Sequence, residues 1–112
     1  MMNKTLEHEI TTLHAEICAG LADPTRILIL YELSDQPKNV SDLADCLNIP
    51  QPTISRHLKV LRDRGMVTTL RMAQVVEYHL ADHRLIEALD LLRGLMRDQF
   101  TSRAALVEQL EA

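Results

Sequence analysis

A polar segment in the middle of the chain carries the side chains best suited to contact DNA. Ile54, Leu58 and Leu61 recur at helical spacing and predict a helix with one buried face over residues 51–64. The polar residues near the start of that helix lie off the apolar stripe and are Gln51, Thr53, Ser55, Arg56 and His57. Arginine pairs with guanine, glutamine with adenine and a threonine methyl with thymine, whereas serine and the first helix amides bind phosphate. The segment therefore predicts base and phosphate contacts, with a solvated helix face as the alternative.

Further basic and polar residues follow on the same helix and beyond it. Lys59, Arg62 and Arg64 are expected to hold phosphate groups or to flank the site, with ordinary surface charge as the alternative. Arg71 and Gln74 lie in a short connection between two stretches rich in β-formers. We expect these two side chains to reach a groove or the DNA backbone.

Basic charge is concentrated in this part of the chain. The formal net charge of the 112 residues is −4, which by itself disfavours a nucleic-acid partner. Residues 51–80 nevertheless carry net +3, whereas residues 1–50 carry net −5 and residues 81–112 carry net −2. The net charge of the contacting segment affects phosphate binding more than the net charge of the whole chain does. The positive charge of residues 51–80 therefore favours DNA as a partner. Two Tyr, one Phe and no Trp are too few for the stacking platforms of single-strand binders, which leaves double-stranded DNA.

Length and composition predict a single globular domain over residues 1–112. Apolar residues make up 46% and charged residues 25%, both ordinary for a folded domain. No apolar run approaches the roughly 18–20 residues of a membrane span, and the N-terminus lacks the apolar stretch of a secretory signal. The two cysteines lie 28 positions apart, without a Cys-x-x-Cys motif. We therefore expect a protein of the reducing cytoplasm, associated with the nucleoid.

Sequence motifs for catalysis are missing. The chain has no G-x-S-x-G, H-E-x-x-H or P-loop motif, and its three glycines form no phosphate-binding loop. We therefore expect neither an enzyme nor a bound cofactor.

The order of predicted elements indicates a mainly α fold with a small β-hairpin. Asp23-Pro24 and Asn39 are helix start signals, and Gly65 is a C-terminal stop. Helices are expected over residues 4–20, 24–33, 39–47, 51–64 and 82–110, and strands over 66–70 and 75–80. The buried residues expected on the second and third helices are Ile27, Leu28, Leu30, Tyr31, Val40, Leu43, Ala44 and Leu47. A helix-turn-helix over 39–64 followed by a wing over 66–80 is the winged helix-turn-helix arrangement.

The first and last helices carry apolar stripes that a domain of this size does not need for its own core. On the first helix the stripe is Leu6, Ile10, Leu13 and Ile17. On the last it is Leu85, Ile86, Leu89, Leu92, Met96 and Phe100, continued by Leu106, Val107 and Leu110. A homodimer formed by the helices 4–20 and 82–110 is the simplest cover for both stripes.

Three blocks of the chain match one known family in residue type and spacing. They are residues 21–26 (LADPTR), 40–44 (VSDLA) and 51–61 (QPTISRHLKVL), the last followed by a Gly-Met-Val at 65–67. Over roughly residues 10–100 the chain closely resembles the ArsR/SmtB family of bacterial repressors. The resemblance implies a homodimeric winged-helix protein that releases operator DNA when an inducer binds. Arg26 falls in the first block and is either a phosphate contact or an internal ion-pair partner.

The two metal sites that the resemblance implies lack their ligands here. One family site uses a Cys-x-Cys pair at the start of the third helix, where this chain has Asn39 and Ser41. Another uses Asp-x-His and His-x-x-His/Glu on the last helices of two subunits. The matching positions are Asp82, Arg84, Leu95 and Asp98. Arginine and leucine cannot bind zinc, and a zinc site needs about four ligands, so we expect neither metal site.

A third departure from the family concerns the turn of the wing. Ala73 stands where the family often has glycine. Because a left-handed backbone costs alanine more than glycine, we expect a wider wing turn than is usual in the family.

Cys18 and Cys46 are the only thiols and are candidates for a sensor. Oxidation, or capture of a soft electrophile, would shift the dimer away from its DNA-binding geometry. The alternative is two small hydrophobic residues that only pack. His14 lies four residues before Cys18 on the same helix face, but two ligands do not make a metal site.

Two classes of function remain open from the sequence. The leading one is a homodimeric, sequence-specific repressor whose two recognition helices meet successive major grooves about 34 Å apart, on an inverted-repeat operator. Its inducer is open between a thiol-directed or redox signal and a non-metal ligand. The alternative is a winged-helix protein-interaction module without operator binding, which the net negative charge favours. The Arg, His and Lys side chains between residues 51 and 61 favour the repressor.

Overall fold

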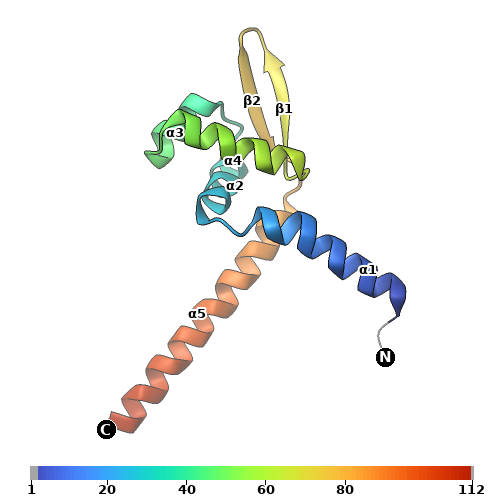
Figure 1. Ribbon diagram of the computed structural model, residues 1–112. Helices are drawn as coiled ribbons and strands as arrows, with labels where there is room; N and C mark the ends of the chain where they lie inside the picture. The colour runs from blue at the N-terminus through green and yellow to red at the C-terminus, as the bar shows by residue number, and fades with distance from the viewer. Residues whose placement is uncertain (1–2, 112) are drawn as a thin grey trace. The chain divides into compact units, whose positions relative to one another are not determined.

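The computed structural model describes residues 3–111, and the chain divides into two compact units, one ending at Asp82 and the other beginning at His83. The first unit contains α1 (Lys4–Leu13), the π-helical turn η1 (His14–Cys18), α2 (Pro24–Asp35), α3 (Val40–Leu47), α4 (Gln51–Asp63), β1 (Val67–Met72) and β2 (Val75–Leu80) (Figure 1). The second unit is formed by α5 (Arg84–Glu111). Helices followed by an antiparallel two-stranded hairpin confirm the mainly α, winged helix-turn-helix class. Residues 1, 2 and 112, which the single-domain prediction includes, lie outside the described residues.

Local capping interactions set the predicted helix ends. The Asp23 carboxylate accepts a hydrogen bond from the Thr25 N–H at 2.8 Å, and Asn39 Oδ1 accepts one from the Asp42 N–H at 2.8 Å. Gly65 follows α4 with φ of +73°, the left-handed conformation that a helix C-terminus favours. Asp23 and Asn39 satisfy N–H groups that the first turn of a helix leaves unpaired, whereas the Gly65 N–H donates to the Arg62 carbonyl at the end of α4.

The end of the first helix departs from its predicted regularity. The sequence predicts one helix over residues 4–20, but residues 14–18 form a π-helical turn. The N–H of Ala19 donates to the carbonyl oxygen of His14, five residues back. A π-helical turn inserts one extra residue into the helix and changes which carbonyl groups are paired.

The core of the first unit lies between α2, α3, α4 and the hairpin. These three helices contact one another, and each also contacts a strand. The largest fully buried side chains are Ile29, Leu30, Leu43, Ile54, Leu58, Leu61, Met66 and Val67. Burying one such side chain stabilises the fold by about 1.5–3 kcal/mol before entropy is counted. The predicted inward faces of α3 and α4 are confirmed at Leu43, Ala44 and the α4 stripe.

The predicted inward face of α2 is wrong in its rotation. Leu28 was expected inside and is 50% exposed, whereas Ile29 and Leu33 are buried. Ile27 and Tyr31 are half-buried, and only Leu30 is buried as expected. The reason is that α2 is apolar around much of its circumference, so periodicity alone does not show which side meets α3, α4 and β2.

The wing is a tight hairpin. β2 has the predicted bounds, whereas β1 starts one residue later and ends two residues later than predicted, so that Val67 pairs with Leu80 and Met72 with Val75. Only Ala73 and Gln74 remain between the strands, and Ala73 takes a φ of +57°. The expected wide turn is therefore wrong: pairing along the whole hairpin holds alanine in the left-handed region despite its steric cost.

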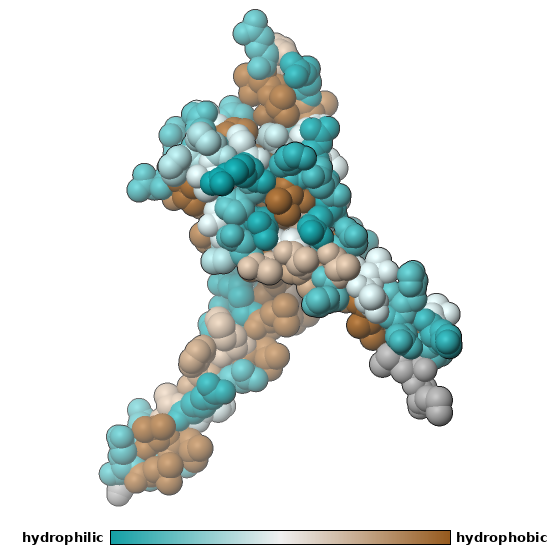
Figure 2. Space-filling view, viewed as in Figure 1, coloured by the Kyte–Doolittle hydropathy of each residue, from teal (hydrophilic) through white to brown (hydrophobic). Residues whose placement is uncertain are grey.

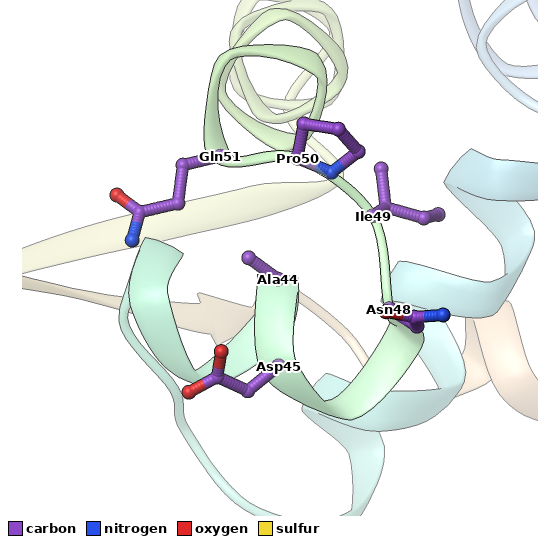
Figure 3. Close-up of a pocket in the computed structure, with 6 residues that line it drawn as sticks. All are labelled: Ala44, Asp45, Asn48, Ile49, Pro50 and Gln51. Carbon is purple, nitrogen blue, oxygen red and sulfur yellow. The ribbon is translucent and has the colours of Figure 1, made fainter.

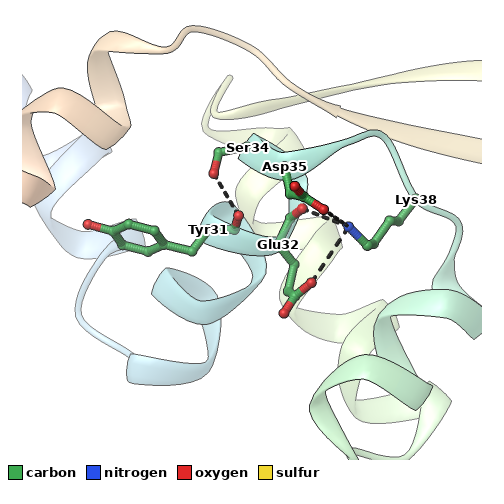
Figure 4. A network of polar contacts seen from close by, with 5 residues as sticks. All are labelled: Tyr31, Glu32, Ser34, Asp35 and Lys38. Atoms are coloured by element: carbon green, nitrogen blue, oxygen red, sulfur yellow. Dashed lines mark hydrogen bonds and ion pairs between the residues drawn. The ribbon is translucent and has the colours of Figure 1, made fainter.

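A buried lysine joins the end of α2 to the base of the wing (Figure 4). Lys38 is 6% exposed, and its Nζ donates to the Glu32 carbonyl oxygen at 2.9 Å and lies 3.6 Å from Glu32 Oε2. Asp35 Oδ2 lies 3.8 Å from the same Nζ. The main chain of Lys38 also pairs with Tyr78 of β2 in both directions, at 2.8 and 3.2 Å. Lys38 therefore anchors the wing to the helical core through both its main chain and its side chain.

Two helices carry exposed apolar side chains. On α1, Leu6, Ile10 and Leu13 are 41–49% exposed. Apolar surface also follows α5 in the space-filling view (Figure 2). Its exposed members are Leu91, Leu92, Leu95, Met96, Phe100, Leu106, Val107 and Leu110. None of the helices in the described part is long and apolar enough to cross a membrane.

Candidate nucleic-acid interface

The turn between α3 and α4 sets the start of the candidate recognition helix. Asn48 takes the left-handed conformation, with φ of 54° and ψ of 49°, and ends α3. The Ile49 N–H then donates to the Ala44 carbonyl at 3.0 Å, and Pro50 supplies the first carbonyl of α4. A pocket lies at this turn, and Figure 3 shows the side chains that line it. It is lined by Ala44, Asp45, Asn48, Ile49, Pro50 and Gln51.

Helix α4 has one wholly apolar side and one exposed polar side. Ile54, Leu58 and Leu61 are fully buried against the rest of the first unit. The predicted contact residues that are exposed are Gln51, Ser55, Arg56, Lys59 and Arg62. Burial of the stripe fixes the rotation of the helix, so these side chains share the solvent side. The structure therefore places most of the predicted contact residues together on one surface.

Two of these residues have neighbours on the same helix. Arg56 Nη2 donates to Thr53 Oγ1 at 3.4 Å, and Thr53 is half-buried. Lys59 Nζ lies 3.3 Å from Asp63 Oδ2, in an exposed pair one helical turn apart. Exposed pairs of this kind contribute about 0–1 kcal/mol, so a phosphate group can replace the carboxylate at little cost.

His57 is turned toward the interior on one side of its ring. It is half-buried, and its Nδ1 lies 3.3 Å from Arg26 Nη1. Because the guanidinium only donates, Nδ1 accepts in this contact and Nε2 remains for another partner. A contact between His57 and DNA stays a prediction, and it would have to be made by Nε2.

Arg26 is an internal side chain whose hydrogen bonds go mainly to main-chain carbonyls. Its Nε donates to the Gly20 carbonyl at 2.6 Å, and its Nη2 to the Ala19 carbonyl at 3.4 Å. Asp23 lies nearby, and its pKa is lowered chiefly by the hydrogen bond from the Thr25 N–H. Desolvation raises the pKa of Asp23 in part, and smaller Coulombic interactions with His57 and Arg26 lower it again.

Arg64 also faces the protein, although the sequence predicts a phosphate contact or a flanking charge. Its Nη1 donates to the carbonyl oxygens of Ala15 at 2.5 Å and of Glu16 at 3.1 Å. Glu16 Oε2 lies 3.8 Å from the same atom. The partners lie 48 and 49 positions away in sequence, so no local pattern indicates this role.

The tip of the wing presents both polar and apolar groups. Arg71 and Gln74 are exposed, as predicted for residues that reach a groove. Leu70 and Met72 are each 51% exposed and Val75 is 46% exposed. Strand register places Leu70, Met72 and Val75 on the face opposite to Arg71.

Two thiols are candidates to react with an effector. Cys18 and Cys46 are both free thiols with exposed side chains. Among residues 3–111, no three His, Cys, Asp or Glu side chains come together in a group that could hold a metal ion.

Sequence comparison identifies relatives of this chain. A family model described as "Bacterial regulatory protein, arsR family" matches residues 23–69. The transcriptional repressor SmtB of Mycobacterium tuberculosis is 43% identical over 77 residues, which are 69% of this chain and 57% of the relative. The nodulation protein NolR of Rhizobium meliloti is 33% identical over 107 residues, 87% of this chain and 88% of the relative. The chain thus spans less than two thirds of the mycobacterial repressor but most of NolR.

Solved structures show the same architecture. Reduced HlyU from Vibrio cholerae superimposes with a TM-score of 0.72 at 29% identity, covering 83% of this chain and 97% of HlyU. The homodimeric winged helix-turn-helix domain Mb0332 from Mycobacterium bovis gives a TM-score of 0.74 at 19% identity, covering 88% of this chain and 91% of that domain.

A three-helix core, a recognition helix with an exposed polar face and a wing together define a winged helix-turn-helix protein. Within that class, the chain belongs to the arsR family of bacterial regulatory proteins. The family model describes regulatory proteins and SmtB is named as a transcriptional repressor, in agreement with the expectation that the chain is not an enzyme.

Proposed function

We propose that this protein is a homodimeric, sequence-specific transcriptional repressor that binds double-stranded DNA with α4 in the major groove. The observation that carries the proposal is the division of α4 into two sides. Its apolar stripe is fully buried, and its other side exposes amide, hydroxyl, guanidinium and ammonium groups within the basic segment. A helix face of this composition is complementary to base edges and phosphates.

The DNA contacts are assigned by position along α4 and the wing. The exposed Arg56 and Gln51 lie on the N-terminal half of α4, from which a recognition helix reads base edges. The other residues assigned to base or phosphate contact are Thr53, Ser55, His57, Lys59, Arg62, Arg71 and Gln74. Of these, Lys59, Arg62 and Arg71 carry the charge that makes binding depend on salt.

The exposed apolar stripes support a dimer. A monomer would leave Leu6, Ile10 and Leu13 of α1 exposed to water. It would also leave exposed the part of the α5 stripe that comprises Leu92, Met96, Phe100, Leu106, Val107 and Leu110. Pairing of first and last helices between two copies covers both stripes. Two copies related by a two-fold axis read two half-sites about 34 Å apart, so the operator is an inverted repeat.

The inducer is a thiol-directed signal or a non-metal ligand. Exposure of Cys18 and Cys46 supports access of oxidants and electrophiles to both sulfur atoms. The family metal positions carry Asn39 and Ser41, which supply no thiolate. A repressor of this kind works in the cytoplasm, on the nucleoid.

The test is selection of duplexes from a random DNA library, followed by fluorescence anisotropy on the selected and on a scrambled duplex. We expect a selected inverted repeat that binds at least about 10³-fold more tightly than the scrambled duplex. The anisotropy titration is then repeated after mild oxidation of the protein, with Cys18→Ser and Cys46→Ser as controls. Loss of binding that either substitution prevents would show that the thiols carry the signal. Failure to enrich any sequence would refute the repressor and support the winged-helix protein-interaction module instead.

A further inference from the structure

The first helix ends in a stretch of main chain that two arginines from other helices bind. Arg64, the C-cap of α4, donates to two carbonyl oxygens, and Arg26 of α2 donates to two more. The four carbonyls belong to residues 15, 16, 19 and 20. We call these two guanidinium groups and four carbonyls the carbonyl clamp.

The carbonyl groups that the clamp binds lie in the π-helical turn and directly after it. In a π-helix each N–H bonds to the carbonyl five residues back, so one carbonyl loses its usual partner where the turn is inserted. The guanidinium of Arg64 lies at this point, over the Ala15 and Glu16 oxygens. Hydrogen bonds from a charged donor to carbonyls near the negative end of a helix are stronger than neutral ones.

Gly20 allows the close approach that the clamp needs. A Cβ at this position would lie 2.1 Å from Met66 Cε and 3.0 Å from Arg64 Cδ. Met66 is fully buried, so it has little room to move aside. The absence of a side chain at Gly20 thus lets the main chain lie directly against Met66 and Arg64.

The clamp contacts α4 at its middle and at its C-terminal end. Arg26 contacts His57 with the same guanidinium that binds the Ala19 and Gly20 carbonyls. Arg64 holds the C-terminal end of α4, seven residues or about 10 Å further along the helix axis than His57. A helix attached at two points along its axis cannot rotate or tilt independently of the element to which it is attached.

We propose that Arg26 and Arg64 are positioning residues that set the orientation of α4 from the end of the first helix, and so determine DNA sequence discrimination. The inference rests on the proposed DNA-binding function. The alternative role for both arginines is a phosphate contact. We favour a positioning role because their N–H groups donate to main-chain carbonyls. The side chain of Arg64 is 30% exposed, compared with 77% for Lys59 on the same helix.

The experiment compares Arg64→Ala, Arg64→Lys and Lys59→Ala in the full chain, with Arg97→Ala on α5 as a control for loss of one positive charge. The probes are the duplex selected by the unmodified protein and its scrambled counterpart, titrated by fluorescence anisotropy at several salt concentrations. Thermal unfolding followed by circular dichroism shows which variants are folded at the titration temperature.

For Arg64→Ala we expect the ratio of selected to scrambled affinity to fall by about tenfold or more, the effect of one or more misplaced base contacts. Its salt dependence stays unchanged, whereas Lys59→Ala lowers the slope of log K against log salt by about 1. Arg64→Lys keeps a charged donor for the carbonyls and restores most of the ratio. Arg97→Ala changes neither quantity.

Two results would overturn the inference. One is a folded Arg64→Ala protein whose ratio of selected to scrambled affinity is unchanged. In that case the clamp would stabilise the fold without affecting DNA sequence discrimination. The other is equal loss on both duplexes with a lower salt slope, which would make Arg64 a phosphate contact. If Arg64→Ala does not fold, Arg26→Lys, which keeps the charge but not the planar set of donors, is held to the same two criteria. If the unmodified protein selects no duplex, the proposed function itself fails, which is a different outcome from either of these.

Discussion

Replacement of Gly20 by alanine tests the packing at the end of the first helix. The added Cβ would lie 2.1 Å from Met66 Cε, a separation that forces one of the two groups to move. Met66 is fully buried, and overpacking at such a site costs about 1–3 kcal/mol. Alanine in place of a helical glycine recovers about 0.5–1 kcal/mol. The net expectation for Gly20→Ala is a loss of about 1–2 kcal/mol in the free energy of unfolding.

The assay is urea and thermal denaturation at one fixed protein concentration, because dimerisation makes stability depend on concentration. For a domain of this size the expected loss corresponds to a fall in Tm of roughly 5–15 °C. Gly94→Ala is the control, since a Cβ there meets nothing within 4 Å and the position lies inside α5. That substitution is expected to raise the stability by about 0.5–1 kcal/mol.

A second substitution makes the test specific for Met66. Met66→Leu removes the terminal methyl group that the new Cβ would strike. In that background the cost of Gly20→Ala should shrink by about 1 kcal/mol, which a double-mutant cycle measures directly. Equal costs in the two backgrounds, or a Gly20→Ala protein as stable as the parent, would refute the reasoning.

Three further predictions address the interface, the wing and a helix cap. Arg56→Ala should lower discrimination at one base position by about 1–3 kcal/mol in anisotropy titrations, while sedimentation shows the dimer unchanged; equal weakening on all duplexes would instead indicate a phosphate contact. Ala73→Gly should raise the midpoint of urea unfolding slightly, by about 0.5 kcal/mol in free energy, because glycine accepts the φ of +57° without strain; a loss of stability would contradict the strained turn. Because the folded-state pKa of Asp23 lies below 3.8, its contribution to stability is present above that pH and is lost as the pH falls through the folded value. Asp23→Asn should therefore flatten the acid limb of stability against pH, and an unchanged acid limb would exclude this group as a contributor.

The sequence predicted those features that depend on near neighbours along the chain. Asp23 and Asn39 cap helices through amides two and three residues away, and Gly65 ends α4 through its own backbone freedom. The apolar stripe of α4 likewise shows which of its residues must face water. These interactions act within one or two helical turns, so residue type and spacing determine them.

The candidate contact surface was predictable for the same reason, but only in part. Gln51 and Arg56 are exposed because the opposite side of their own helix is strongly apolar. His57 and Arg64 are on the same helix, yet each has a donor or acceptor engaged by a distant segment. Their partners are fixed by how the helices pack, and helical periodicity carries no information about that packing.

The sequence alone determines a winged helix-turn-helix chain whose fourth helix has a basic, polar face, with Asn39 and Ser41 in place of the cysteines of one family metal site. The tertiary structure decided that Arg26 and Arg64 hold main-chain carbonyls rather than face the solvent. It also decided that Leu28 is outside and Ile29 inside on α2, and that Ala73 is held in a tight turn. In each case the outcome depends on atoms that folding brings together from distant parts of the chain, such as Arg64 and Ala15, which lie 49 positions apart. Spacing along the chain specifies the elements, whereas contact between the elements specifies these partners.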